Sequence, residues 1–333
     1  MPPSFCVLPG REVVDLLTGR ETEVIDRVRD AYLLHQAGDS VNPDSYFLRF
    51  PDKPDARIIA LPSYLGGDSD VAGIKWIASF PGNVSSGLPR ASAVLVLNDY
   101  STGYPFAVIE AAGISAARTA ASAALAARTL GGGRPDRVGV VGGGVIARTI
   151  VRYLHAAGIP LSTVHCHDID EHSAHNLVDH LKATYGAEAR AATLDEALDS
   201  DVVVLATTAL NPYIPAAHRL RPGQLVLNVS LRDLAPETLL SANNVLDDVE
   251  HCLKAGTSPH LAEQLTGNRD FITGTLAQVI QDEVRLDPSR PTVFSPFGLG
   301  VLDLAVGHHL YSVARDTGRL IEVPGFFGET QRW

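Results

Sequence analysis

The chain has 333 residues, of which 45% are hydrophobic and 20% charged, a composition typical of a globular protein with room for two domains. A formal charge of -11, without a dense run of Lys and Arg, argues against nucleic acid as a partner. No apolar stretch is long enough to span a membrane, the first residues lack a signal-peptide pattern, and three scattered cysteines fit a reducing compartment. We therefore expect a cytoplasmic protein with no membrane segment and no metal site.

The first part of the chain predicts helices followed by a sheet. Residues 12–36 repeat apolar positions at helical spacing, which indicates one or two helices. Between residues 46 and 97, short apolar runs alternate with Pro, Gly and Asp turns, and "STGYPFAVIEA" continues them as a hairpin arm. This pattern predicts an antiparallel sheet. Residues 114–129 are rich in alanine and are followed by Gly131–Gly133, which predicts a helix and its stop.

After this break, strand and helix alternate. "RVGVVGGG", "LSTVHCHDID", "EARAAT" and "DVVVLATT" have strand character and are separated by helical segments, and "QLVLNVS" and "NNVLDDV" add two more strands. Such alternation is typical of a Rossmann-type, doubly wound parallel sheet. The last part, "FSPFGLGVLDLAVGHHLYSVARDTG", predicts a loop and a helix that returns to the first domain. We therefore expect an α/β protein with a discontinuous α+β outer domain, residues 1–125 and 305–333, and a Rossmann domain, residues 126–304.

The segment "VGVVGGGVIA" contains the G-x-G-x-x-A pattern of dinucleotide sites, as Gly142, Gly144 and Ala147. Gly142 permits a tight turn, and Gly144 lets the backbone approach a pyrophosphate. The helix that opens with Val145 and Ile146 favours the negative charge of that pyrophosphate. An alternative is that the glycines only allow close packing of helix and strand.

An acidic residue follows at the spacing that such sites use. Asp168 lies some two dozen residues after Gly144, at the end of the next strand. A carboxylate there accepts hydrogen bonds from the adenosine ribose and repels a 2'-phosphate, which favours NAD over NADP as the cofactor. Asp170 is a competing acidic candidate. Thr207 and Thr208 follow a later strand, where open sheets bind ligands, although either could simply cap a turn.

Four cations stand out in the outer domain. Lys75 is one of only four lysines, against 23 arginines, and lies in the apolar segment "AGIKWIASFPGN". A desolvated lysine can lose its proton and an arginine cannot, which suits catalysis, although strand alternation leaves open that Lys75 points outward. Arg118 interrupts an apolar helix and must reach either solvent or an anion such as a carboxylate. Arg49 fits a solvent-facing position as well as a ligand position, and Arg90 in "LPRAS" is a further cation.

These segments together resemble the ornithine cyclodeaminase and mu-crystallin family. The resemblance runs through "RIIALPSYLGG", "AGIKWIASFPGN", "ISAARTAASA", "VVGGGVIA" and "FGLGVLDLAVG" and covers nearly the whole chain. "AGIKWIASFPGN", "RASAVLVLND" and "NVSLRDL" are most similar to the branch of NAD-dependent dehydrogenases that form L-2,3-diaminopropionate for siderophores and peptide antibiotics.

The resemblance implies a substrate, N-(2-amino-2-carboxyethyl)-L-glutamate, and a mechanism. NAD would take a hydride from the glutamyl α carbon, and hydrolysis of the imine would release 2-oxoglutarate and L-2,3-diaminopropionate. Arg49 and Arg118 match the family's ligands of substrate carboxylates, and Lys75 matches its active-site lysine. The family's catalytic aspartate lies in a Gly/Asp/Pro/Gly-type turn, which this chain replaces with "NVSLRDLAPE", so Asp233 is only approximately at that position. Asp303 fits the closing helix in a structural or a catalytic role.

The resemblance also implies a homodimer built through the outer-domain sheets, and it leaves other functions open. A cyclodeaminase converts L-ornithine to L-proline and ammonia without accumulating NADH. Other relatives reduce imines or interconvert alanine and pyruvate. A crystallin-like protein would bind a nucleotide and a small ligand without turnover, but the joint presence of Lys75, Arg49 and Arg118 argues against it. Net formation of NADH distinguishes these possibilities.

Overall fold

The computed structural model describes residues 4–131, 133 and 135–328. The chain forms two compact units: unit 1 comprises residues 1–118 and 299–333, and unit 2 comprises residues 119–298. Both boundaries precede those expected from the sequence, so Asp303 belongs to unit 1. The expected glycine stop after residue 130 includes Gly132, which lies outside the described residues. The elements that begin in unit 1 are β1 (Cys6–Leu8), α1 (Gly10–Leu17), α2 (Glu21–Gln36), β2 (Ser40–Val41), β3 (Tyr46–Phe50), β4 (Lys53–Leu65), β5 (Val71–Ser79), a 3-10 helix (Pro81–Ser86), β6 (Ala91–Asp99), β7 (Pro105–Glu110), α3 (Ala112–Leu130), α11 (Gly300–Asp316) and β16 (Ile321–Glu322).

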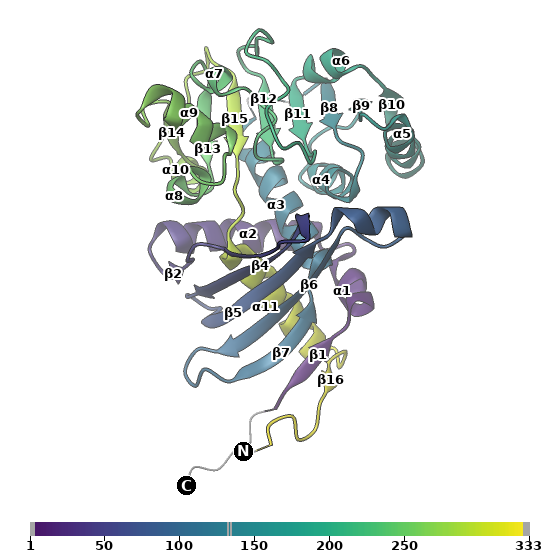
Figure 1. The fold of residues 1–333 in the computed structure, drawn as a ribbon, viewed down its shortest axis with the longest axis vertical. Helices are drawn as coiled ribbons and strands as arrows, with labels where there is room; N and C mark the ends of the chain where they lie inside the picture. Colours follow the sequence, from purple (N-terminus) through teal and green to yellow (C-terminus); the bar gives the residue numbers. More distant parts are fainter. Residues whose placement is uncertain (1–3, 132, 134, 329–333) are drawn as a thin grey trace. The chain divides into compact units, whose positions relative to one another are not determined.

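Unit 1 is built on one sheet with the strand order β16-β1-β7-β6-β5-β4-β2, and β3 also pairs with β4 (Figure 1). Its strands from β2 to β7 pair antiparallel, as the alternating pattern predicts. The sequence predicted no strand before residue 46; β1 lies parallel to β7, so the whole sheet is mixed. The two strands are far apart in sequence, and therefore no hairpin connection forces them to run in opposite directions.

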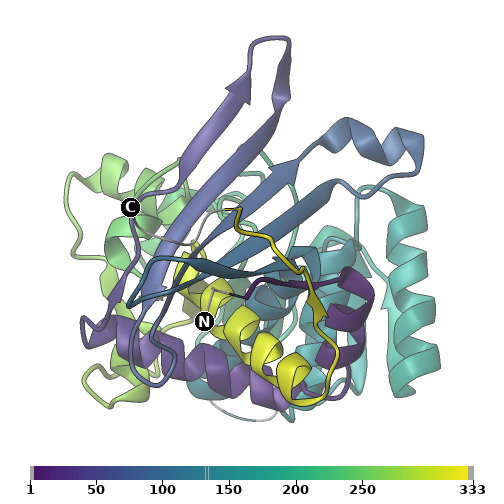
Figure 2. The same ribbon diagram turned by 90° about the horizontal axis from the view of Figure 1, so that it is seen from below.

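One face of this sheet is covered by α11, which packs along β4 to β7 and against α1 and α2 (Figure 2). Two glycines allow the close approach of helix and sheet. A Cβ on Gly73 would collide with the Val96 carbonyl and the Leu304 side chain, and a Cβ on Gly307 would collide with Leu95. These contacts place the first turns of α11 directly over β5 and β6.

The other face of the sheet carries an exposed apolar row. Tyr46, Ala60, Trp76 and Val94 lie opposite one another on β3, β4, β5 and β6. Since successive side chains on a strand point to opposite faces, this row and Lys75 lie on different faces. Tyr46 is 69% exposed, Trp76 41% and Val94 40%. A contiguous exposed row of large apolar side chains is typical of a protein-interaction surface.

Unit 2 is built on a second sheet, in which every strand pair is parallel. The strand order is β10-β9-β8-β11-β12-β15-β13-β14. The order reverses between β8 and β11, as in the doubly wound fold predicted from the sequence. The elements of unit 2 are β8 (Arg137–Val141), α4 (Val145–Ala156), β9 (Thr163–His167), α5 (Glu171–Tyr185), β10 (Glu188–Ala191), α6 (Leu194–Leu198), β11 (Val202–Leu205), β12 (Leu225–Asn228), α7 (Pro236–Leu239), β13 (Asn243–Leu246), α8 (Val249–Cys252), α9 (Ser258–Thr266), β14 (Ile272–Thr275), α10 (Leu276–Ile280) and β15 (Thr292–Ser295).

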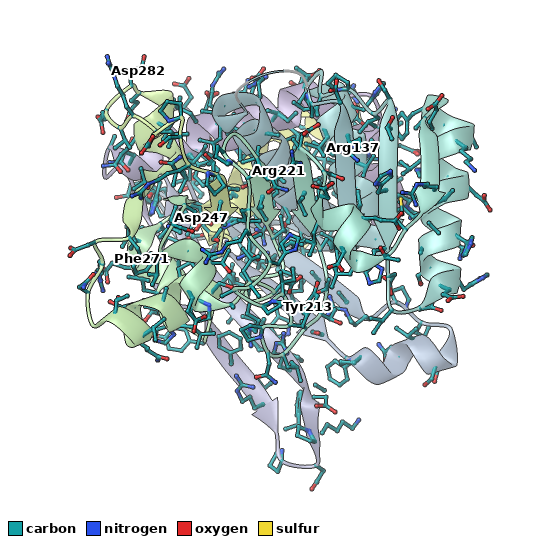
Figure 3. All side chains as sticks on the ribbon, turned by 90° about the horizontal axis from the view of Figure 1, so that it is seen from above. Arg137, Tyr213, Arg221, Asp247, Phe271 and Asp282 are labelled. Carbon is teal, nitrogen blue, oxygen red and sulfur yellow. The ribbon has the colours of Figure 1, made fainter. Side chains whose placement is uncertain are left out.

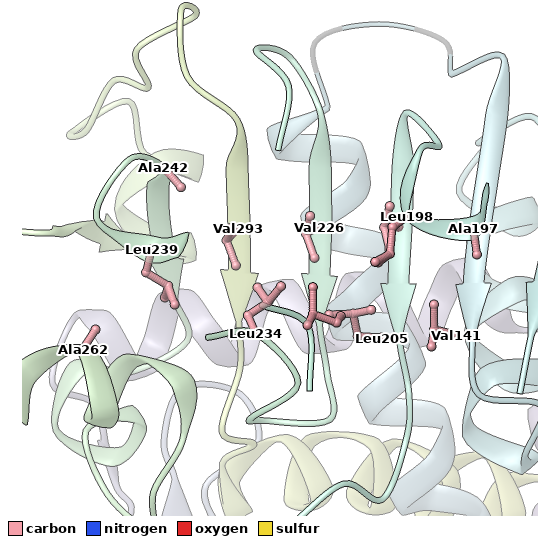
Figure 4. Packing of buried hydrophobic residues seen from close by; sticks show 12 residues of the cluster. Val141, Ala197, Leu198, Leu205, Val226, Leu234, Leu239, Ala242, Ala262 and Val293 are labelled. Carbon is pink, nitrogen blue, oxygen red and sulfur yellow. The ribbon is translucent and has the colours of Figure 1, made fainter. Parts of the chain in front are cut away.

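The central strands of unit 2 are completely buried, which explains their uninterrupted apolar sequences. Val203, Val226 and Val293 from β11, β12 and β15 contribute to one core cluster, together with Leu205 and Leu234 (Figure 4). This core fixes the carboxyl ends of β8, β11 and β12, where ligands of such sheets bind. In the part of the chain that the structure describes, no helix is long and apolar enough to cross a membrane.

Candidate functional site

The covered face of the unit 1 sheet contains a buried ion cluster formed by Lys75, Asp303 and Arg118. Lys75 is 2% exposed and Asp303 is completely buried. The Lys75 Nζ lies 2.6 Å from Asp303 Oδ2, and the Arg118 Nε lies 3.3 Å from Asp303 Oδ1. Lys75 also donates a hydrogen bond of 3.3 Å to Ser115 Oγ. A single carboxylate therefore pairs with two cations.

Three elements that are distant in sequence supply this cluster. Lys75 is in the middle of β5, and Asp303 is in the first turn of α11. Ser115 and Arg118 are three residues apart on α3, so they share one face of that helix. The sequence left open whether Lys75 points outward and whether Arg118 meets an anion. Both side chains point to the covered face, and both meet Asp303.

Burial lowers the pKa of Lys75 from its ordinary value of 10.5 to about 8. The cause is desolvation, which disfavours the charged ammonium; Asp303 opposes this effect, and the positive charge of Arg118 reinforces it. The lysine can therefore gain and lose a proton near neutral pH, as a group that transfers protons in a reaction must. An arginine at this position would remain charged.

Further arginines lie on the same face of the sheet, away from the cluster. Arg49 on β3 pairs with Arg57 on β4, which pairs with Ser79 on β5. Ser79 is four residues after Lys75 on one strand, so this whole row shares the face of Lys75. The structure thus places Arg49, which is exposed, farther along the sheet and not beside Lys75. Arg90 donates a hydrogen bond of 3.1 Å to Ser79 Oγ and extends the cationic surface.

The glycine loop of unit 2 follows β8 and has the geometry of an anion site. Gly142 has a φ of +103°, and a Cβ there would collide with the Ala206 carbonyl. Gly144 is the N-cap residue of α4, and no side chain of the described residues caps this helix. A Cβ on Gly144 would meet no described atom within 4 Å. The exposed Val145 and half-buried Ile146 begin the helix. The N–H groups of the first turn have no partner within the helix, and the space beside Gly144 is open, so a phosphate group is favoured there.

Two carboxylates follow β9, and the structure gives them different roles. The Asp168 carboxylate accepts hydrogen bonds from the N–H of Gly143 at 2.6 Å and of Asp170 at 2.9 Å, which turns it toward the glycine loop. Asp170 is the N-cap of α5 and accepts from the N–H groups of His172 and Ser173. Asp168 is therefore the better placed of the two acidic candidates to meet a ribose bound at the glycine loop.

Asp233 lies in unit 2 and is completely buried. Its carboxylate accepts hydrogen bonds from the hydroxyls of Thr207, Tyr213 and Ser230 (Tyr213 is labelled in Figure 3). Burial raises the pKa of Asp233, and the three hydroxyl groups oppose this effect. The hydroxyl of Thr207, expected to contact a cofactor or cap a turn, thus binds Asp233, whereas Thr208 is exposed.

Several of these residues escaped the sequence analysis. Ser115, Tyr213 and Ser230 are common polar residues. The partners of Ser115 and Tyr213 lie 20 or more residues away in the sequence, and only Ser230 binds a residue close to it, Asp233. The one available signal was position, because Ser230 lies two residues after the end of a strand of the parallel sheet, as Thr207 does. The donor role of Gly143 is a backbone property and carries no residue signature.

Comparison with known proteins identifies the family of the chain. The sequence profile of the ornithine cyclodeaminase/mu-crystallin family matches residues 10–318. The chain is 28% identical over 324 residues to the N-((2S)-2-amino-2-carboxyethyl)-L-glutamate dehydrogenase of Staphylococcus aureus, with 92% of this chain and 94% of that protein covered. Its structure is similar to that of the Thermococcus litoralis Delta(1)-pyrroline-2-carboxylate reductase in complex with NADH and L-proline, with a TM-score of 0.88, 26% identity, and 96% and 100% of the chains covered. It is also similar to an archaeal alanine dehydrogenase dimer with bound NAD, with a TM-score of 0.87, 27% identity, and 97% and 100% covered.

The ion cluster makes a prediction about stability. We expect Asp303→Asn to lower the free energy of unfolding by about 3–5 kcal/mol, because the substitution leaves the buried Lys75 and the largely buried Arg118 without an opposite charge. Urea unfolding followed by circular dichroism measures this change. Asp316→Asn, an exposed position on the same helix, is the matched control and should change stability by less than about 0.5 kcal/mol. Equal stability of the two variants would contradict the importance of the cluster.

Proposed function

Since the chain belongs to the ornithine cyclodeaminase/mu-crystallin family, we propose that it is an NAD-dependent dehydrogenase that acts on the amine of an amino acid. The substrate that we propose is N-(2-amino-2-carboxyethyl)-L-glutamate. Its oxidation and hydrolysis consume NAD and water and yield 2-oxoglutarate, L-2,3-diaminopropionate, NADH and a proton. The observation that carries this proposal is the buried Lys75, whose pKa of about 8 suits proton transfer, in one cluster with Arg118.

The residues of unit 2 fit the cofactor. The open space beside Gly144 suits the pyrophosphate of NAD, which the N–H groups at the start of α4 would hold, while Gly142 shapes the turn before them. Asp168 would accept hydrogen bonds from the adenosine ribose. NAD, when bound, supplies the hydride acceptor. The relatives support this choice, because the Thermococcus reductase was solved with NADH and the archaeal alanine dehydrogenase with NAD.

The residues of unit 1 fit the amino-acid substrate. Arg118 and Arg49 would bind carboxylates, for which the planar guanidinium offers two parallel hydrogen bonds. Lys75 in its neutral form would accept the proton of the amine or of the water that attacks the imine. Asp303 keeps both cations of the cluster in place.

The proposed substrate has three carboxylates, and the distribution of positive charge supports it. Ornithine and alanine have one carboxylate each, which Arg118 alone could bind. The row that contains Arg49, Arg57 and Ser79, with Arg90 beside it, offers additional cations on the face of Lys75. The resemblance to the Staphylococcus aureus enzyme, whose name specifies this substrate, points to the same choice. A product of this kind would supply siderophore or peptide-antibiotic assembly.

A second candidate function follows from the solved structures. The Thermococcus reductase and the archaeal alanine dehydrogenase act on small substrates with one carboxylate. Reduction of a cyclic imine or oxidation of L-alanine would use the same Lys75 and the same cofactor loop, and cyclodeamination of L-ornithine would use them without net formation of NADH. The arginines near Ser79 would then have no substrate group to bind.

We further propose that the protein is a cytoplasmic homodimer. The exposed row of Tyr46, Trp76 and Val94 on the sheet of unit 1 is a suitable interface, because burying it in a symmetric contact removes apolar surface from water. The archaeal alanine dehydrogenase is a dimer. The three cysteines are free thiols, which fits a reducing compartment.

The first test of the function is an assay of products. Purified protein with NAD and N-(2-amino-2-carboxyethyl)-L-glutamate should form one NADH for each 2-oxoglutarate and each L-2,3-diaminopropionate, measured by absorbance and by mass spectrometry. Parallel reactions with L-ornithine and L-alanine should form much less product. Proline from ornithine without NADH, or a preference for L-alanine, would overturn the assignment.

The lowered pKa of Lys75 predicts a pH dependence. Below pH 8 the lysine carries a proton and cannot accept another, so kcat/KM should rise with pH through a midpoint of about 8. Lys75→Arg stays protonated, and it should therefore lose this rise and about 10²–10⁴-fold in kcat/KM. An unchanged midpoint in the variant would contradict the role of Lys75.

The same pKa affects stability. Since the folded-state pKa of Lys75 is below the unfolded value of 10.5, the burial of its charge destabilises the fold up to about pH 8, and this cost fades as the pH rises toward 10.5.

Asp168 predicts the preference between the two nicotinamide cofactors. Asp168→Ser removes a carboxylate that would repel a 2'-phosphate and accept hydrogen bonds from the ribose hydroxyls. The ratio of kcat/KM for NAD to that for NADP should therefore fall about 10- to 100-fold. Asp170→Ser is the matched control. Serine is also a good N-cap for α5, and the ratio should therefore not change. A similar fall in both variants would mean that Asp168 does not select the cofactor.

The apolar row predicts the oligomeric state. Wild-type protein should sediment as a dimer at micromolar concentration, and Trp76→Glu should sediment as a monomer, because it would bury a charge in the interface. Val84→Glu, at an exposed apolar position on the 3-10 helix and not on a strand of the row, should remain dimeric. A dimeric Trp76→Glu protein would place the interface elsewhere.

A further inference from the structure

We propose that Asp233 is a positioning residue, which holds together the loops after β11 and β12, and that it does not exchange a proton with the substrate. This inference rests on the proposed function and refines it. The resemblance to the family had placed Asp233 approximately at the position of a catalytic aspartate. The surroundings of its carboxylate give it a different task.

Both carboxylate oxygens of Asp233 already accept hydrogen bonds. Oδ1 accepts a hydrogen bond from Thr207 at 2.9 Å, and Oδ2 accepts from Thr207 at 2.9 Å, from Tyr213 at 3.1 Å and from Ser230 at 2.6 Å. The residue has no exposed surface. A general base needs direct access to the proton that it removes, at about 2.6–3.2 Å between heavy atoms or through one water. Asp233 would have to lose several of these bonds before a substrate could reach it.

The backbone of Asp233 is fixed as firmly as its side chain. Its carbonyl accepts hydrogen bonds from the N–H of Tyr213 at 3.1 Å and of Ile214 at 3.0 Å. Ile214 and the adjacent Leu234 form a parallel bridge, and both belong to the core cluster of unit 2. Asp233 therefore ties residues 207–214 to residues 230–234 through main chain and side chain together.

The backbone of the turn before Asp233 is held in an uncommon conformation. Leu231 has a φ of +75°, a conformation that side chains other than glycine rarely adopt. The Leu231 carbonyl accepts a hydrogen bond of 2.8 Å from the N–H of Ser258, and the N–H of Ser230 donates to the Leu205 carbonyl at the end of β11. Such a conformation persists where the surroundings impose it, and it is common at functional sites.

Contacts of Thr207 and Ala206 connect these loops to the glycine loop. The Thr207 hydroxyl accepts from the N–H of Ala209, so the bond to Asp233 orders the start of the loop after β11. The preceding Ala206 carbonyl lies against Gly142, where a Cβ would collide with it. Displacement of Thr207 would thus disturb the wall of the glycine loop. Asp233 should consequently matter most for the binding of NAD.

The test separates positioning from proton transfer by two measurements. Asp233→Asn keeps the size of the side chain and should weaken NAD binding about tenfold, measured by calorimetry without any amine substrate. The pH at the midpoint of the kcat/KM profile should stay as in the wild type. Unchanged NAD binding, with kcat/KM reduced about 10²–10⁴-fold and the rise with pH lost, would overturn the proposal, because it is the behaviour of a proton acceptor.

Further variants keep the test decisive if Asp233→Asn fails to fold. Tyr213→Phe and Ser230→Ala each remove one donor and should weaken NAD binding, and their double variant should show less than the sum of the two effects, since both act through one carboxylate. Unchanged NAD binding in both single variants would also overturn the proposal. Asp287→Asn is the control, because Asp287 binds the Ser289 hydroxyl in the loop before β15, at the amino ends of the parallel strands, whereas Asp233 follows a carboxyl end. Calorimetry with NAD alone gives its answer even if the wild-type protein acts on another amine.

Discussion

The candidate site of unit 1 depends on one carboxylate buried between two cations. Asp303 pairs with Lys75 and Arg118, and none of the three side chains has much access to water. Buried charges are costly, and the removal of one partner leaves the others uncompensated. This cost becomes useful at Lys75, because desolvation lowers its pKa into the range where a proton can be exchanged. The contact between Lys75 and Asp303 therefore affects both the stability of unit 1 and the pKa of Lys75.

The packing of α11 and the ion pair form a single constraint. Asp303 reaches β5 because Gly73 and Gly307 allow the helix to lie close to the strands. The contact joins residues that are 228 positions apart in the sequence. Local patterns could predict the strand that contains Lys75 and the helix that contains Asp303. They could not predict which face of the sheet the helix covers, and so the orientation of Lys75 required the structure.

The features predicted best were those encoded by short, contiguous segments. The glycine loop, the order of β8, α4 and β9, and the acidic residue at the end of β9 follow from patterns of about 30 residues. The features predicted least were non-local or lacked a period. The parallel pairing of β1 with β7 depends on strands far apart in sequence, and the short helices α7 to α10 have too few turns to show a hydrophobic stripe.

Hydrogen-bond partners resolved two choices that composition left open. Asp170 is occupied as a helix cap, which leaves Asp168 to face the glycine loop. Asp233 is occupied by three hydroxyl groups, which leaves Lys75 as the group suited to proton transfer. In both cases the residue type suits the chemistry, and the contacts favour one residue for the proposed role. Under the proposed function, unit 1 would provide the cations for an amino-acid substrate and unit 2 the loop for NAD.

If burial desolvates Lys75 enough for it to lose its proton near neutral pH, this lysine must titrate well below an ordinary lysine. The chain has only four lysines, so the side-chain signals of lysine-labelled protein can be followed by NMR across pH 6 to about 11 and assigned by loss of one signal in Lys75→Met. We expect the Lys75 signal to titrate at about 8, well below the other three. Titration of all four near the ordinary value of 10.5 would show that Lys75 stays protonated at neutral pH and would rule out its role as a proton acceptor.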